Sequence, residues 1–106
     1  MASWMKKRRT RPWVQVPMSV AGTLYVRVAA PGLVELSLRN GQPAATGTVV
    51  LGTLPVGYRP SRSQDVAATS GVLRLGQDGS ISLVSITQAT AWQYVSHVYT
   101  TDEEVA

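Results

Sequence analysis

Apolar and polar residues alternate with a period of two along several short runs of this chain, and this alternation most limits the folds open to it. Residues 24–28 place their aliphatic side chains on one face and Tyr25 and Arg27 on the other, and residues 34–38 alternate in the same way. Such a period is typical of a half-buried β-strand. No eleven-residue window shows a helical period, and glycine and proline recur at intervals that would break a helix. The chain is therefore predicted to be all-β.

Turn-forming residues separate the predicted strands. A Pro-Gly pair follows the first clear strand and an Asn-Gly pair follows the second. An Asp-Gly pair at Asp78 and Gly79 suits the positive φ angles of a type I′ hairpin turn. One domain with about 7–8 short strands is predicted to form a small antiparallel β-sandwich or barrel. Strands are expected at residues 24–28, 34–38, 48–51, 72–76, 80–85 and 92–99, and a further extended piece is expected near residues 63–69.

The alternation also predicts which side chains form the core, because a shift of one residue would turn a whole strand over. In the last strand we place Trp92 and Tyr94 inward, and His97 and Tyr99 on the polar face. The side chains expected to point inward are Leu24, Val26, Val28, Val34, Leu36, Leu38, Val49, Leu51, Leu73, Leu75, Ile81, Leu83, Trp92 and Tyr94.

The positive charge of the chain is concentrated at its N-terminus. The formal net charge is +4, and five of the ten basic residues lie within residues 6–11. Residues 12–106 hold five arginines against six acidic residues. We therefore divide the chain into a basic N-terminal arm (1–13), a β-sandwich domain (14–101) and an acidic C-terminal tail (102–106).

The arm has two interpretations. It is either a solvated tail or an anchor that binds an acidic protein surface or phosphate in a salt-sensitive way. As an anchor it would combine five cations with two tryptophans, since aromatic side chains carry much of the binding energy at such contacts. Its anchoring residues would be Trp4, Lys6, Lys7, Arg8, Arg9, Arg11 and Trp13.

Composition favours an oligomer. Only 15% of the residues are charged, which is low for a soluble monomer, and a subunit interface would cover surface that charge does not.

Cysteine is absent, so no disulfide or thiolate metal site can form. The apolar runs are too short to span a bilayer, and no apolar segment follows the basic stretch as it would in a secretory signal. We expect no membrane partner.

The sequence contains no evident catalytic or metal-binding constellation. His97 is the sole histidine, which excludes a multi-histidine metal site. Acidic residues are few: Asp78 belongs to its turn, Glu35 to the solvent face of a strand, and nothing pairs two carboxylates as a glycosidase requires. The glycines are spaced as turns rather than as a phosphate-binding loop. We expect a protein that is not an enzyme and that needs no metal or cofactor.

The segment Leu-Pro-Val-Gly-Tyr-Arg-Pro at residues 54–60 is the most distinctive connection. Its two prolines exclude an interior strand, and Gly57 permits a sharp turn before Tyr58. Two interpretations remain open. Either Tyr58 folds back to close one end of the sandwich while Arg59 bonds to nearby carbonyl groups, or both side chains are exposed ligand contacts.

Further ligand candidates come from the last strand. A carbohydrate platform would use one or two exposed rings, and His97 and Tyr99 lie on the predicted polar face. Nucleic-acid binding by stacked rings is disfavoured, because the basic residues of the arm are not interleaved with the aromatic residues of the strands. The candidate ligand-binding residues are therefore Tyr58, Arg59, His97 and Tyr99.

The order of these features resembles a known family. A strand pair over residues 24–38 precedes a strand at 48–51, the segment 54–60, an Asp-Gly hairpin and a closing aromatic strand. Over residues 20–99 this order is similar to the C-terminal β module of bacteriophage tail-fibre and minor tail proteins, a receptor-binding module. The resemblance implies a β-sandwich that is usually trimeric and often contacts host-surface carbohydrate.

Two functions are therefore expected for a protein of the virion surface, assembled in the host cytoplasm. The first is a homotrimeric tail-fibre or tail-tip module that attaches the virion to host glycan. The second is a capsid decoration protein, a cement or minor capsid protein whose arm docks on other virion proteins. The capsid decoration function stays open because the module of the family commonly ends a much longer fibre. Glycan binding by the isolated domain would favour the first, and salt-dependent docking on a shell protein the second.

Overall fold

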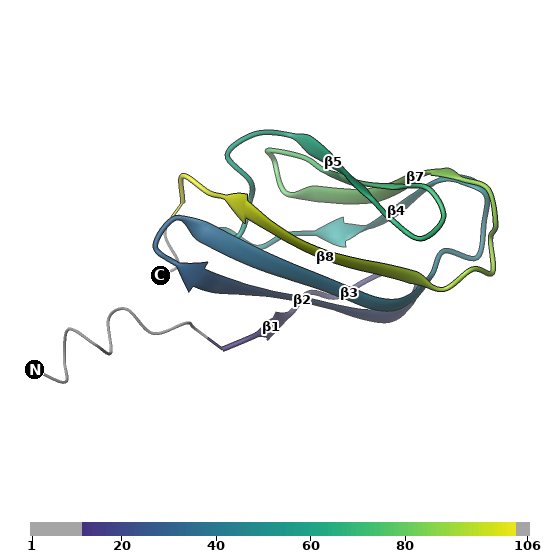
Figure 1. The fold of residues 1–106 in the computed structure, drawn as a ribbon, viewed down its shortest axis with the longest axis horizontal. Coiled ribbons are helices and arrows are strands. Elements are labelled where there is room, and N and C mark those ends of the chain that lie inside the picture. The colour runs from purple at the N-terminus through teal and green to yellow at the C-terminus, as the bar shows by residue number, and fades with distance from the viewer. Residues whose placement is uncertain (1–11, 104–106) are drawn as a thin grey trace, which may run out of the picture.

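Two antiparallel β-sheets form the fold in the computed structural model of the protein, which describes residues 12–103 (Figure 1). Across these residues there are eight strands and no helix, which confirms the predicted all-β class. The strands are β1 (Val14–Gln15), β2 (Ala21–Ala30), β3 (Leu33–Gln42), β4 (Gly47–Thr53), β5 (Gln64–Ala67), β6 (Val72–Leu75), β7 (Ser80–Ile86) and β8 (Gln93–Thr100).

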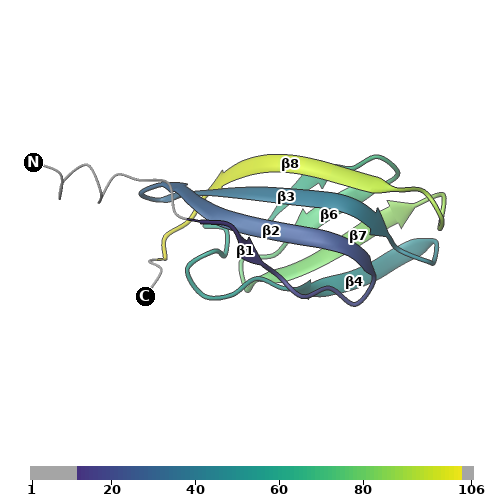
Figure 2. The same ribbon diagram turned by 90° about the horizontal axis from the view of Figure 1, so that it is seen from below.

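The two sheets stack as a small β-sandwich. The first sheet has the strand order β1-β2-β3-β8, and the second sheet has the order β4-β7-β6-β5. The chain passes to the second sheet after β3 and returns after β7, so β8 closes the sheet that β1 opened. Figure 2 shows the first sheet in front of the second.

The core between the sheets follows the predicted alternation in β2, β3, β4, β6 and β7. Among the expected core residues, Val28 and Val49 are partly buried and pack against the core. The two expected core residues of the closing strand region, Trp92 and Tyr94, are not in it. The remaining ten are buried, namely Leu24, Val26, Val34, Leu36, Leu38, Leu51, Leu73, Leu75, Ile81 and Leu83.

The predicted register of β8 is wrong by one residue. Trp92 is 52% exposed and Tyr94 is 49% exposed, whereas Gln93, Val95 and Tyr99 are buried. The inward glutamine is stable because its amide has two backbone partners, described below, so its polar atoms are satisfied. The hydrogen bonds of Gln93 thus explain why the buried face of β8 is the opposite of the predicted one.

Two of the predicted turns also differ. The Asn-Gly pair at residues 40–41 ends no strand: it lies inside β3 as a bulge opposite β8, with Asn40 at φ +54°. In the β6–β7 hairpin Gly79 N donates to Gly76 O, and Gly79 alone has a positive φ, of +96°. This is a type I turn followed by a glycine bulge rather than a type I′ turn. The Pro-Gly turn between β2 and β3 is confirmed.

Hydrogen bonds close both long sides of the sandwich. Beside β8 and β5, the His97 ring nitrogen Nε2 lies 2.7 Å from Gln64 Oε1. On the opposite side, Ser19 N donates to Leu51 O at 2.8 Å and Ser19 Oγ donates to Val50 O at 2.6 Å. The link between β1 and β2 therefore covers part of the edge of β4, which would otherwise offer free backbone groups.

Candidate functional site

The segment 54–60 closes one end of the sandwich. Tyr58 N donates to Pro55 O at 3.1 Å, and Gly57 between them has φ +99°, as a type II turn requires at its third residue. Tyr58 turns inward and is only 6% exposed. Tyr99 Oη donates to Tyr58 O at 2.6 Å, and burial raises the pKa of the Tyr99 hydroxyl. Of the two interpretations of Tyr58, the one in which it folds back to close the end of the sandwich is confirmed. The predicted place of Tyr99 on the polar face of the last strand is wrong, because Tyr99 is only 4% exposed.

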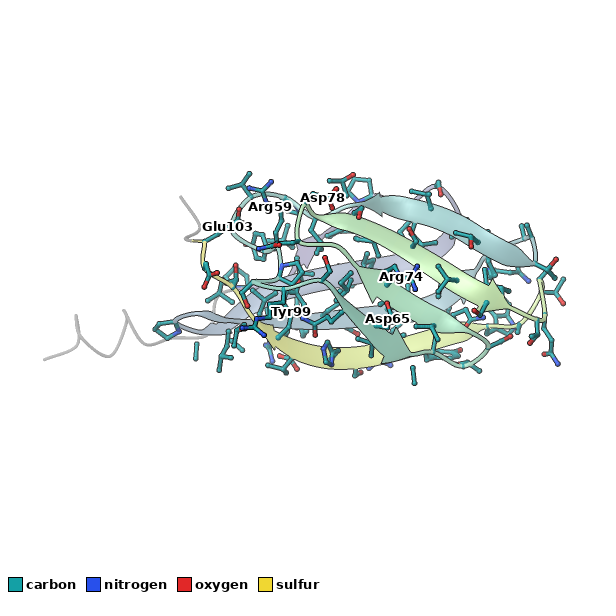
Figure 3. The ribbon with its side chains drawn as sticks, turned by 90° about the horizontal axis from the view of Figure 1, so that it is seen from above. Arg59, Asp65, Arg74, Asp78, Tyr99 and Glu103 are labelled. Atoms are coloured by element: carbon teal, nitrogen blue, oxygen red, sulfur yellow. The ribbon has the colours of Figure 1, made fainter. Side chains whose placement is uncertain are left out.

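Glu103 fastens the chain beyond β8 to this segment, as Figure 3 shows. Its carboxylate accepts hydrogen bonds from Gly57 N at 3.0 Å, Arg59 N at 3.3 Å and Arg59 Nε at 2.8 Å, and it also pairs with Arg59 Nη2. The bond from the Arg59 side chain, followed by that from Gly57 N, lowers the pKa of Glu103 to about 2. Arg59 thus binds a carboxylate instead of the expected carbonyl groups. Glu103, which we expected in the acidic tail, packs against the sandwich.

The same segment docks on the β6–β7 hairpin. Leu54 N donates to Gly79 O at 2.7 Å. A Cβ atom at Gly79 would lie 2.9 Å from both Leu54 O and Arg59 Cδ, so only glycine fits beneath the arginine side chain. The two sequence features that carry the resemblance, the segment 54–60 and the Asp-Gly hairpin, therefore contact each other. Their pattern reflects packing at this end of the sandwich.

His97 is half-buried and also takes part in internal contacts. Because the Gln64 amide oxygen only accepts, His97 Nε2 donates the bond between them. The His97 ring stacks on the Tyr99 ring, with 6.1 Å between their centroids. The structure thus gathers three of the four predicted ligand residues, Tyr58, Tyr99 and His97, on the inner side of β8. Arg59 is partly exposed and is occupied by Glu103.

A different surface gathers aromatic and polar groups: the outer face of the first sheet. The register sets Tyr25 of β2 opposite Ser37 of β3 on this face. Arg27 follows Tyr25 along β2, and its guanidinium lies 4.3 Å from the centroid of the Trp13 ring. Such a cation–π contact holds the indole in place beside β2.

A hollow of about 240 Å³ opens on this face and is lined by Trp13, Tyr25, Ser37 and Arg39. We call it the aromatic hollow. Trp13 is 39% exposed and Arg39 is exposed, so both are accessible from solvent. Beyond the hollow, Tyr94 of β8 is exposed, and its hydroxyl donates to Asn40 Oδ1 at 2.6 Å, next to Arg39. Rings and polar groups therefore extend across β2, β3 and β8.

The outer face of the second sheet is different in character. A broader, open hollow of about 630 Å³ is lined by small and polar residues around Arg74 and Asp78, without an aromatic ring. Arg74 is already engaged, since its Nε donates to Asp65 Oδ1 at 2.9 Å, and this bond lowers the pKa of Asp65. Figure 3 shows this pair on the second sheet. The residues that line this hollow therefore offer no ring surface on which a sugar could stack.

The predicted anchoring arm lies almost wholly outside the described residues. Trp13 is the exception, because it packs on Arg27 of the sandwich instead of leading away from it. The residues outside the described range are Trp4, Lys6, Lys7, Arg8, Arg9 and Arg11.

The sequence contained part of the signal for the aromatic hollow. Alternation alone placed Tyr25 and Arg27 on the outer face of their strand. The contribution of Trp13 and Arg39 was missed, because it depends on β1 pairing with β2 and on the continuation of β3 through its bulge.

Comparison of the chain with known protein families, with characterised proteins and with solved structures found no match to any of them. Within residues 12–103, no group of three or more His, Cys, Asp or Glu side chains could hold a metal ion. The same part of the chain has no helix with the length and apolarity to cross a membrane.

Proposed function

We propose that this protein is a binding module of a bacteriophage virion surface that attaches to host-surface carbohydrate through the aromatic hollow. One observation carries the proposal: two aromatic rings, a hydroxyl group and a guanidinium line a single hollow on the outer face of the first sheet. Sugars have apolar ring faces and polar edges, and binding sites that combine apolar walls with a few directed polar groups suit such ligands. The order of sequence features that resembles phage tail-fibre modules supports the virion setting.

In this proposal the ligand is bound by residues other than Tyr58 and Tyr99. Trp13 and Tyr25 supply the ring surfaces, and Ser37 and Arg39 supply the polar contacts. The end of the sandwich around Tyr58 serves to hold the fold. A homotrimer, as in the family that the sequence resembles, would present three such hollows, and multivalent attachment raises the avidity of weak sugar binding.

The test is binding of the labelled, purified protein to a panel of bacterial cells and immobilised cell-surface polysaccharides. We expect binding that is lost in a Trp13→Ala, Tyr25→Ala variant. A Trp92→Ala variant is the matched control, because it removes an exposed ring outside the hollow. Binding that survives the double substitution, or no binding to any cell or polysaccharide, would refute a carbohydrate role for this face.

A second candidate, a capsid decoration protein, rests on the charge of residues 6–11. If the arm anchors the protein, deletion of residues 2–11 should leave a folded protein that no longer joins the particle. Attachment of the full chain should then weaken as salt rises, because exposed ion pairs are screened. Full incorporation of the truncated protein would exclude anchoring by the arm.

A further inference from the structure

The arginines among the described residues differ in whether a carboxylate binds them. Three of the five are held by carboxylates: Arg27 by Glu35, Arg59 by Glu103 and Arg74 by Asp65. The structure gives no carboxylate partner to the other two, Arg39 and Arg62, among residues 12–103. Both of these side chains are exposed.

Arg39 is the one of this pair that lines the aromatic hollow. The other residues lining the hollow are Trp13, Tyr25 and Ser37, none of which is acidic. The one acidic residue of β2 and β3 is Glu35, and Arg27 Nε donates to its carboxylate at 2.7 Å. Arg27 and Glu35 neutralise each other, so the hollow keeps the uncompensated positive charge of Arg39.

We propose that the aromatic hollow selects an acidic sugar unit, a hexuronic acid residue, whose carboxylate binds Arg39. This inference rests on the proposed carbohydrate function and names its ligand class. A guanidinium matches a carboxylate with two parallel hydrogen bonds, which are stronger than bonds between neutral groups. The rings of Trp13 and Tyr25 border the same hollow and contact the apolar face of the sugar. Ser37 offers a hydroxyl group to a ring hydroxyl.

The arrangement separates two tasks within one small site. Ring contacts do not distinguish an acidic from a neutral sugar, since both have an apolar face. Arg39 makes that distinction, because a neutral sugar leaves its charge without a counter-ion while a uronate supplies one. Selectivity for the acidic sugar is therefore expected to depend on Arg39, and general affinity on the rings.

The experiment compares oligosaccharides of galacturonic and glucuronic acid with their methyl-esterified counterparts, which keep the sugar and lose the charge. Binding is measured by calorimetry and by NMR titration of the full chain. We expect the acidic forms to bind at least about tenfold more tightly, and Arg39→Gln to abolish that preference, as the loss of one charge-assisted pair implies. Arg62→Gln is the matched control, an exposed and unpaired arginine outside the hollow, and should change nothing.

The outcomes separate this inference from the proposed function. Equal binding of acidic and esterified forms, with loss only in Trp13→Ala, overturns the acidic preference and leaves the carbohydrate function standing. A preference that persists in Arg39→Gln overturns the role of Arg39. If neither acidic oligosaccharide binds, the inference is overturned, and the panel of cells and polysaccharides then decides the wider function separately.

Discussion

The side-chain amide of Gln93 exchanges two hydrogen bonds with the backbone of Ser70. Ser70 N donates to Gln93 Oε1 and Gln93 Nε2 donates to Ser70 O, both at 2.8 Å. Gln93 is fully buried, and its amide takes the place that a neighbouring strand would have. The pair joins the start of β8 to the turn between β5 and β6, so it links the two sheets and fixes which face of β8 turns inward.

Replacing Gln93 by leucine should destabilise the protein although it adds apolar volume. The change leaves the N–H and C=O of Ser70 without their partner, and each unsatisfied group that stays buried costs about 1–3 kcal/mol. The expected loss appears as a lower midpoint in urea unfolding with an unchanged slope. Ser96→Leu is the control, because Ser96 lies on the outer face of the same strand. Equal stability of the two variants would show that the Gln93 bonds contribute nothing net.

Gly79→Ala should destabilise the protein more than Gly47→Ala. Both glycines have positive φ angles, +96° and +86°, so alanine is strained at either position by about 1–2 kcal/mol. Only at Gly79 would the new Cβ meet other atoms, 2.9 Å from Leu54 O and Arg59 Cδ, whereas nothing lies within 4 Å at Gly47. The difference between their free energies of unfolding measures the packing of the segment 54–60 on the hairpin. Equal losses of stability in the two variants would mean that the segment 54–60 moves away from the new Cβ atom without a cost in free energy.

Acid should release the chain after β8 from the segment 54–60. The pKa of Glu103 falls from 4.5 in the unfolded chain to about 2 in the fold, because Arg59 and Gly57 donate to its charged form. A lowered pKa means that this contact stabilises the fold above pH 4.5 and loses its effect as the pH falls toward 2. The amide shifts of Gly57 and Arg59 should therefore titrate together with a midpoint near 2. In Glu103→Gln this shared titration should vanish, and a midpoint near 4.5 in the native chain would contradict the contact.

The sequence alone was sufficient to predict the buried face of those strands in which one face is apolar and the other polar. In β2 and β3 this contrast is clear, and Leu24, Leu36 and Leu38 are buried as predicted. In residues 92–99 both faces carry rings and valines, so hydrophobicity could not choose between them. The choice depended on Gln93 meeting Ser70, a partner 23 residues away, which no local pattern encodes.

The candidate site depended still more on pairing across the chain. Alternation placed Tyr25 on the outer face, but the hollow also needs Trp13, which directly precedes β1, and Arg39 of β3. The segment 54–60 was prominent in the sequence for a structural reason, since Tyr58 and Arg59 hold the end of the sandwich. A distinctive motif thus marked a packing site, while the accessible rings came from less distinctive runs.

The last prediction is that the full chain is a homotrimer whose contact includes the apolar pair of Leu33 and Val98. These side chains are 37% and 51% exposed. Both lie on the outer face of the first sheet, because Val98 is two residues along β8 from Ser96, and Ser96 pairs with Ser37 on that face. A stable interface should bury more than about 1,000 Å² in total, and exposed apolar side chains are the surface it would cover. Light scattering at micromolar concentration should give three times the mass of one chain. Val98→Lys should lower that mass, whereas Val50→Lys, an exposed valine on β4 of the other sheet, should not. The mass of a single chain for the native protein would overturn the trimer. A trimer that tolerates Val98→Lys as well as Val50→Lys would place its contact elsewhere on the sandwich.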